Sequence, residues 1–290
     1  MMKVQNPWAG VKGWQDGRVS DAATSETEPT PGRVIDCSDP GQVDAAVAAA
    51  VEAVRAGHCI VIPTDTVYGI GADAFLGSAV QSLLKAKGRG RDMPPPVLVA
   101  DPSVLMALGR EIPDNAKKLA ERFWPGALTL IVPAQTSLRI DLGDTAGTIA
   151  VRVPDHDIAR QVLRGTGPLA VSSANRTGEP SATTAAHARE QLGDRVAVYL
   201  DAGSTPGQVP STIVDFTKSE YGSVVRAGKI PVSALREVIP YLEENIAPVP
   251  PVASAPGDAI TAPAPGDART ASASGAPEPE DSAASEAGTG

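Results

Sequence analysis

Two polar segments of the chain come directly after short apolar runs, and their side chains could bind a small polar substrate. Residues 63–71 read PTDTVYGIG and follow an apolar run at 59–62, whereas residues 172–181 read SSANRTGEPS and follow one at 169–171. Open α/β sheets bind their ligands at the ends of strands. Hydroxyls and a carboxylate in the first segment could orient a substrate. The serines, the amide and the open backbone N–H groups of the second could hold an anion.

Each of these segments also has a purely structural interpretation. Thr and Asp side chains in turns commonly bond to their own backbone, so residues 63–71 could form an ordinary turn. Residues 172–181 could be a polar loop before the next helix. This second segment is longer and richer in Ser and Asn than a connection needs, so we interpret it as a site. Both interpretations stay open for the first segment.

Four basic residues lie within seven positions, namely Lys85, Lys87, Arg89 and Arg91, with glycine at positions 88 and 90. They end a predicted helix, where cations interact favourably with the helix dipole, so a solvated helix end is one interpretation. The other is a polyphosphate site. Arginine binds phosphate through two N–H groups, lysine acts as a point charge, and glycine lets the backbone approach a ligand closely. The residue types alone do not decide between the two.

Several common catalytic and metal-binding signatures are absent from the sequence. It has no GxxxxGK[ST] phosphate loop, no GxGxxG after the first apolar run, no GxSxG and no HExxH. Two cysteines, Cys37 and Cys59, exclude a disulfide framework and a cysteine-rich zinc site. Three scattered histidines argue against a histidine-based metal site. An enzyme that acts on nucleotides would therefore use a less common architecture.

The composition predicts a soluble, cytoplasmic protein. Apolar residues make up 42% of the 290 residues, which is enough for a sizeable core. The longest apolar runs are far shorter than the about 20 residues that a membrane-spanning helix needs, and no secretory signal pattern follows the N-terminus. The formal net charge of −9 argues against a broad basic surface for nucleic acid.

Charge and composition divide the chain into three parts. Residues 246–290 carry six acids, one base, eight prolines and no aromatic residue, and we predict that they form a disordered acidic tail. Residues 1–33 show no periodicity and are interpreted as a flexible extension. Residues 34–245 remain as one domain of ordinary size.

Helix and strand patterns alternate in this central part. Residues 41–56 carry an apolar stripe followed by Gly57, which predicts a helix, and Ser78 is predicted to cap a second one. The alternation predicts an α/β fold with a twisted mixed sheet. Further predicted helices cover residues 114–122, 155–163 and 183–192. Predicted strands cover residues 59–62, 97–99, 127–132, 148–153, 169–172, 196–200, 211–216 and 223–226.

Seven stretches occur in an order and spacing that are typical of one enzyme family. They are PTDTVYGIGADAF (63–75), KGR (87–89), FWPGALTLIV (123–132), TIAVRVPDH (148–156), PLAVSSANRTGEPSATT (168–184), STIVDF (211–216) and VVRAGKI (224–230). Over residues 34–232 the chain resembles the YrdC-like threonylcarbamoyl-AMP synthase family, in its short form without an extra C-terminal domain. The resemblance implies a YrdC-like twisted mixed sheet with flanking helices around a concave basic cavity.

The resemblance also implies a reaction. The chain would be an L-threonylcarbamoyladenylate synthase, a nucleotidyltransferase of tRNA modification. L-threonine, bicarbonate and ATP, which arrives with Mg²⁺, would give threonylcarbamoyl-AMP, pyrophosphate and water. Downstream tRNA threonylcarbamoyl-transfer proteins would use the product to make threonylcarbamoyladenosine in tRNA, and weak tRNA binding by this chain is compatible with that role. No metal ligands on the protein and no membrane contact are implied.

Roles are carried over from the family residue by residue. Lys87 and Arg89 match a K-x-R pair that faces the phosphates, and we assign them as catalytic. Thr66, Arg152 and Ser211 match contacts to L-threonine. Contacts to the nucleotide are matched by Arg89, Thr148, Ser173, Asn175, Ser181 and Arg226.

The loop after the basic residues departs from the family pattern. Met93 stands where an Asn often contacts the nucleotide, and Ala100 where some members carry a threonine-contacting His. Two extra residues are inserted among the prolines at 94–96. These departures concern the details of substrate contact rather than the class of reaction.

Three other functions compete with this interpretation. The first is a double-stranded RNA- or tRNA-binding or ribosome-maturation module of the same fold, whose binding should weaken steeply with salt. The second is another carbamoyl- or acyl-adenylate enzyme, and the third is a paralogue without catalysis. The core's net charge of −3 argues against the first, the lack of extra domains against the second, and the retained K-x-R and S-x-N pairs against the third.

Overall fold

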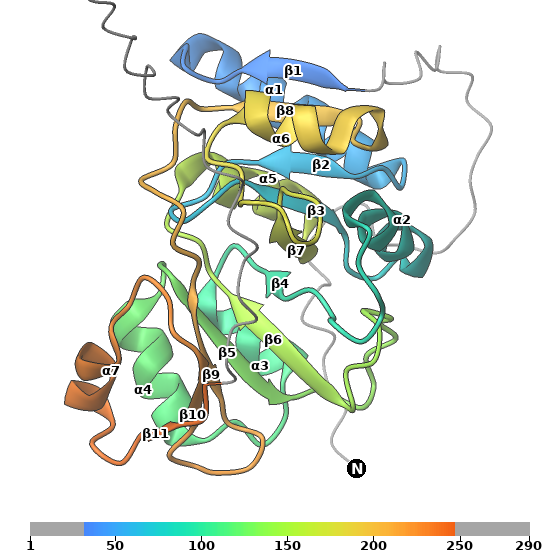
Figure 1. Cartoon of the computed structure of the whole chain (residues 1–290). Coiled ribbons are helices and arrows are strands. Elements are labelled where there is room, and N and C mark those ends of the chain that lie inside the picture. Colours follow the sequence, from blue (N-terminus) through green and yellow to red (C-terminus); the bar gives the residue numbers. More distant parts are fainter. Residues whose placement is uncertain (1–31, 247–290) are drawn as a thin grey trace, which may run out of the picture. The chain divides into compact units, whose positions relative to one another are not determined.

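The computed structural model describes residues 32–246 (Figure 1). The predicted extension (residues 1–33) and the predicted acidic tail (246–290) lie outside the described residues, apart from the few at their inner ends. No helix within the described range is both long and apolar enough to cross a membrane.

Within residues 32–246, eleven strands form one mixed sheet in the order β1-β8-β2-β3-β7-β4-β6-β5-β9-β10-β11. Half of the neighbouring pairs are parallel and half antiparallel, which confirms the predicted mixed sheet. The strands are β1 (Arg33–Asp36), β2 (Ile60–Ile62), β3 (Gly69–Asp73), β4 (Val97–Leu98), β5 (Leu128–Pro133), β6 (Thr148–Arg152), β7 (Leu169–Ser173), β8 (Val198–Asp201), β9 (Thr212–Asp215), β10 (Ser223–Arg226) and β11 (Glu243–Glu244).

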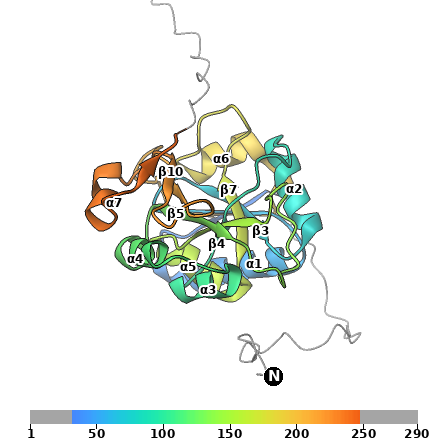
Figure 2. The same ribbon diagram turned by 90° about the horizontal axis from the view of Figure 1, so that it is seen from below.

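Helices lie around the sheet on both of its faces (Figure 2). The α-helices are α1 (Pro40–Arg55), α2 (Gly77–Lys87), α3 (Leu105–Leu108), α4 (Asp114–Phe123), α5 (Asp157–Thr166), α6 (Ala185–Leu192) and α7 (Val232–Val238). Two short 3-10 helices cover Pro102–Val104 and Gly193–Arg195. The predicted helices and strands are all found, with ends that differ by a few residues.

Alternation along the central strands explains why both faces need helices. In β2, Ile60 and Ile62 belong to the core cluster that includes α1 and α5, whereas Val61 belongs to the cluster that includes α2 and α6. All three side chains are fully buried. Successive residues of a strand point to opposite faces, so a strand that is apolar at every position is covered on both sides.

Two local predictions are corrected by the structure. The end of the segment 63–71 is not a turn, because Gly69–Asp73 forms β3, which pairs antiparallel with β2 and β7. At Gly69 a Cβ would lie 2.6 Å from a methyl group of Val171, so the close pairing of β3 with β7 requires glycine there. Ser78 does not cap α2, which begins at Gly77 after Leu76 and has no side-chain cap.

Candidate active site

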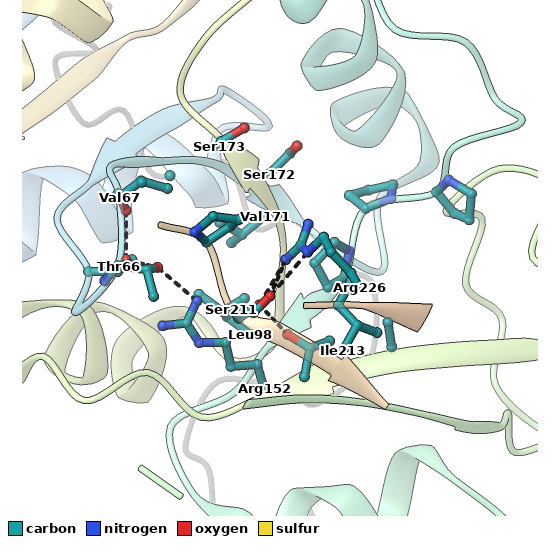
Figure 3. A pocket seen from close by; sticks show the side chains of 18 of the residues that line it. Thr66, Val67, Leu98, Arg152, Val171, Ser172, Ser173, Ser211, Ile213 and Arg226 are labelled. Atoms are coloured by element: carbon teal, nitrogen blue, oxygen red, sulfur yellow. Dashed lines mark hydrogen bonds between the residues drawn. The ribbon is translucent and has the colours of Figure 1, made fainter. Parts of the chain in front are cut away.

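A cavity of about 330 Å³ opens where the loop after β2 meets the ends of β6, β7 and β10 and the start of β9. Eight of the ten residues predicted to contact substrates line it, and they come from segments spread over 161 positions of sequence, from 66 to 226. Figure 3 labels five of them, Thr66, Arg152, Ser173, Ser211 and Arg226, with Thr66 beside Arg152 and Ser211 beside Arg226. The eight are Thr66, Arg89, Thr148, Arg152, Ser173, Ser181, Ser211 and Arg226.

Arg152, at the end of β6, is held by one partner at each of its three nitrogens. Its Nη2 donates to the Asp65 carboxylate at 2.5 Å, its Nη1 to the Thr66 hydroxyl at 3.0 Å, and its Nε to the carbonyl of Gly126 at 3.0 Å. Burial lowers the pKa of the Arg152 guanidinium, and the neighbouring Asp65 charge opposes that shift. Asp65 was outside the predicted site residues, although its carboxylate belongs to the segment singled out for substrate binding.

The hydroxyl of Thr66 can only accept a hydrogen bond from a ligand. Thr64 donates its single hydroxyl proton to the carbonyl of Val67 at 2.6 Å. The contact of 3.0 Å between the Thr64 and Thr66 hydroxyls therefore uses the proton of Thr66. Thr66 also accepts from Arg152, which leaves one lone pair on its oxygen. This side of the cavity suits an amine or hydroxyl group of a substrate.

A second hydroxyl pair lies beside Arg226. The hydroxyls of Ser211 and Thr129 are 2.7 Å apart, both side chains are buried, and both line the cavity. Arg226 donates to the Ser211 hydroxyl at 3.0 Å and to the Ser211 carbonyl at 2.8 Å. The pair has two protons and needs one for its own bond, so one O–H remains to donate to a ligand. The sequence analysis did not identify Thr129 as a site residue. The one feature that could have pointed to it is its position as a polar residue inside the apolar run 127–132.

Arg89 and Arg226 are cations of the cavity without a carboxylate partner among the described residues. Arg89 donates to the Ser172 hydroxyl at 2.9 Å, while its Nε is buried with no partner in the described chain. Burial lowers the pKa of Arg89. Partial burial, together with the positive charges of Arg152 and Arg89, lowers the pKa of Arg226 to about 10. The three arginines therefore converge, and a bound anion would relieve their mutual repulsion.

Lys87 and Asn175 are the two predicted site residues that do not line the cavity. The Lys87 ammonium is 3% exposed and donates to the carbonyls of Ser173 and Asn175, the latter at 2.6 Å. The Asn175 amide donates to the carbonyls of Arg176 and Glu179 at 2.8 and 2.7 Å. Both side chains thus hold the backbone at the end of β7 and in the loop after it, whereas Ser173 at the end of β7 and Ser181 in the loop line the cavity.

The pH dependence of stability offers a test of the environment of Lys87. Burial and the charge of Arg89 lower its pKa from 10.5 to about 7. Between these values the unfolded chain binds one more proton than the folded chain, so this site makes folding more favourable as the pH rises from 7 towards 10.5. The wild-type free energy of unfolding should therefore gain about 3–5 kcal/mol relative to Lys87→Met between pH 7 and pH 10.

Urea denaturation of both proteins at several pH values measures this difference. Lys85→Met, which removes an exposed lysine from the same helix, is the matched control and should not reproduce the gain. A constant difference between wild type and Lys87→Met would show that the loop carbonyls keep the ammonium charged in the folded protein.

Of the residues that depart from the family pattern, some line the cavity and others do not. Met93 is 41% exposed and does not line the cavity, whereas the prolines at 94–96 do. Ala100 packs against the core cluster of α1 and α5 and also lies outside the cavity. A proline has no backbone N–H, so the 94–96 wall offers a ligand carbonyl oxygens and apolar surface only.

Gly228 lies against the backbone of Ser211. A Cβ there would lie 2.4 Å from the carbonyl carbon of Ser211, so only glycine allows the two backbones to approach this closely. The next residue, Lys229, donates through its Nζ to the carbonyl of Asp65 at 2.7 Å. This contact joins the segment after β10 to the loop that carries Thr66.

Within residues 32–246 no group of three or more His, Cys, Asp or Glu side chains is placed to hold a metal ion. Among the described residues, Asp65 is the carboxylate that makes an ion pair with an arginine of the cavity, Arg152. The guanidinium and hydroxyl groups that line the cavity fit anions and a small polar molecule.

The sequence and the fold both match known proteins. A family model described as "Telomere recombination", for Sua5, YciO and YrdC proteins, matches residues 52–228. A Mycobacterium tuberculosis protein named "Putative threonylcarbamoyl-AMP synthase" is 52% identical over 204 residues, which are 70% of this chain and 94% of the relative. A Bacillus subtilis "Threonylcarbamoyl-AMP synthase" is 37% identical over 230 residues, 76% of this chain and 66% of the relative.

A solved structure shows that the similarity extends to the fold. The crystal structure of Pyrococcus abyssi Sua5 complexed with L-threonine superposes with a TM-score of 0.67 at 34% identity. The match covers 73% of this chain and 62% of that one. The twisted mixed sheet described above is therefore the fold of these proteins.

Proposed function

We propose that this chain, which belongs to the family of Sua5, YciO and YrdC proteins, is a threonylcarbamoyl-AMP synthase. The enzyme joins L-threonine, bicarbonate and ATP to give threonylcarbamoyl-AMP, pyrophosphate and water. The observation that carries the proposal is the convergence of three arginines with two hydroxyl pairs in one cavity. It is supported by relatives that bear this name and by the L-threonine complex of P. abyssi Sua5.

The charges of the cavity suggest how the two larger substrates divide it. Arg152 is neutralised by Asp65 and lies beside the Thr66 lone pair, which suits the zwitterion L-threonine. Arg89 and Arg226 keep their charges, which suits the triphosphate of ATP. The free O–H of the Ser211–Thr129 pair is assigned to L-threonine, in keeping with the role predicted for Ser211. Thr148, Ser173 and Ser181 line the nucleotide part.

The chemistry needs positioning rather than a protein nucleophile. The amine of threonine and bicarbonate form a carbamate with loss of water. A carbamate oxygen then attacks the α-phosphorus of ATP, the new P–O bond forms, and the bond to pyrophosphate breaks. Arginines aimed at the phosphates stabilise the charge that grows on the leaving group, and the cavity holds the reactants close together. Lys87 and Asn175 support this step by holding the end of β7, where Ser173 lies, and the loop that follows it.

Mg²⁺ would enter as part of the substrate MgATP. The ion would neutralise phosphate charge. The proposal includes tRNA threonylcarbamoyl-transfer proteins as recipients of the product, a cytoplasmic location and weak tRNA binding. A module that only grips double-stranded RNA is less well supported, because the converging arginines line a cavity of small-molecule size rather than an open surface.

Pyrophosphate release from ATP tests the proposed function. With bicarbonate present, release should require L-threonine and should be much weaker without an amino acid or with L-serine. Release that needs both L-threonine and bicarbonate would support the synthase. If a folded protein that binds ATP releases no pyrophosphate with threonine, the synthase assignment is wrong.

A further inference from the structure

Asp65 has a nearly buried carboxylate that has not been assigned to any substrate contact. Its side chain is 11% exposed, and Oδ1 accepts from both Arg152 Nη2 at 2.5 Å and the backbone N–H of Asp155 at 3.0 Å. The backbone carbonyl of Asp65 accepts from Lys229. The residue is thus fixed by three separate segments of the chain, and its carboxylate is turned to Arg152.

Among the described residues, Arg152 is the one arginine of the cavity that has such a partner. In the described chain no carboxylate oxygen lies within 4.0 Å of a guanidinium nitrogen of Arg89 or Arg226, although the charge of Asp92 acts on Arg89 from a greater distance. An unpaired guanidinium in a cavity attracts any small anion, including phosphate and pyrophosphate. A guanidinium that is already neutralised and held by three partners keeps its orientation but has a weaker net pull on anions.

We propose that Asp65 is a positioning residue that reserves the Arg152 end of the cavity for L-threonine. It holds the guanidinium in place beside Thr66, and it cancels the charge that would otherwise draw phosphate groups to this end. As a result, phosphate groups bind at Arg89 and Arg226 and not at Arg152. This inference rests on the proposed function and concerns how the same cavity separates its two substrates.

The test compares wild type with Asp65→Asn, which keeps the size of the side chain and removes its charge. The KM for L-threonine should rise about tenfold or more, while the KM for ATP stays within about threefold. Inorganic phosphate should compete only with ATP in the wild type. In the variant it should also compete with L-threonine, because Arg152 has become an unpaired cation.

Two further variants separate charge from placement. Asp155→Asn removes an exposed carboxylate from the neighbouring loop, and both KM values and the phosphate inhibition pattern should stay as in wild type. Asp65→Glu keeps the charge but moves it, so the KM for threonine should rise without new competition by phosphate. This variant also serves if Asp65→Asn does not fold.

Equilibrium binding of L-threonine and ATP, measured by calorimetry, distinguishes the ways in which this inference could fail. Wild type that binds ATP but not threonine would overturn both the proposed function and the role of Asp65. Wild type that binds both, with Asp65→Asn binding threonine equally well, would overturn the role of Asp65 alone. A parallel loss of affinity for both substrates, without phosphate competition against threonine, would show that Asp65 is only structural.

Discussion

Arg152→Met is expected to raise the KM for L-threonine by about 100-fold or more and to leave the KM for ATP within about threefold. The guanidinium lies beside the Thr66 hydroxyl in the part of the cavity assigned to threonine, and methionine replaces its volume but none of its N–H groups. The free energy of unfolding should fall by about 3–5 kcal/mol, because the buried Asp65 carboxylate loses its counter-charge. Steady-state kinetics and urea denaturation measure the two effects separately.

The double variant Asp65→Asn with Arg152→Met separates stability from recognition. With both charges removed, most of the lost stability should return, because no buried charge is left unpaired. Threonine binding should not return, because the double variant still lacks the guanidinium. Recovery of both properties would show that Arg152 only serves to neutralise Asp65, and would contradict its assignment to threonine.

Arg89→Met is expected to lower kcat/KM for ATP by about 100- to 1,000-fold, the usual effect of removing one donor to a developing anion. Arg89 lines the cavity, its Nε is buried without a partner, and no described carboxylate lies within ion-pair distance of it. The buried cation is a cost to folding that a bound anion relieves. The variant should therefore be at least as stable as wild type in the absence of nucleotide.

A neighbouring arginine provides the control for this variant. Arg91 lies two residues away on the same loop, but its side chain is 47% exposed and pairs with Asp141 at 2.7 Å. Arg91 does not line the cavity, so Arg91→Met should change kcat/KM for ATP by less than about threefold. Such an exposed pair contributes only about 0–1 kcal/mol to stability, so the variant should also stay folded. Equal losses in the two variants would point to a general effect of loop charge, and near-wild-type turnover by Arg89→Met would contradict its role at the phosphates.

The four clustered basic residues show how much the type and spacing of residues can predict about their roles. The cluster was ambiguous between a solvated helix end and a phosphate site, and the structure divides it. Lys85 is exposed, Arg89 lines the cavity, and Arg91 pairs with Asp141. Lys87 turns inward to the loop after β7. Neighbours on a helix end point in different directions, and spacing alone does not tell which direction meets a cavity.

The strand ends illustrate the opposite case. Apolar runs that alternate with helical patterns predicted the mixed sheet, and the polar segments that follow β2 and β7 do meet at the cavity. The strand β3 was missed because its sequence GIGAD has few β-branched residues, and glycine is disfavoured in strands. Tertiary contact decides this case, since only glycine lets β3 lie against Val171.

By itself, the amino-acid sequence determined the alternation of helices and strands, the polar strand ends and the family to which the motifs belong. These are local properties, because they depend on periodicity, on turn residues and on the order of short motifs. The tertiary structure alone decided which polar and charged side chains are paired. Asp65 and Arg152 are 87 positions apart, as Ser211 and Thr129 are 82 apart, and no local pattern encodes either contact. Whether an arginine attracts an anion depends on such distant partners, because a carboxylate held beside it by the fold reduces the net positive charge that an anion meets.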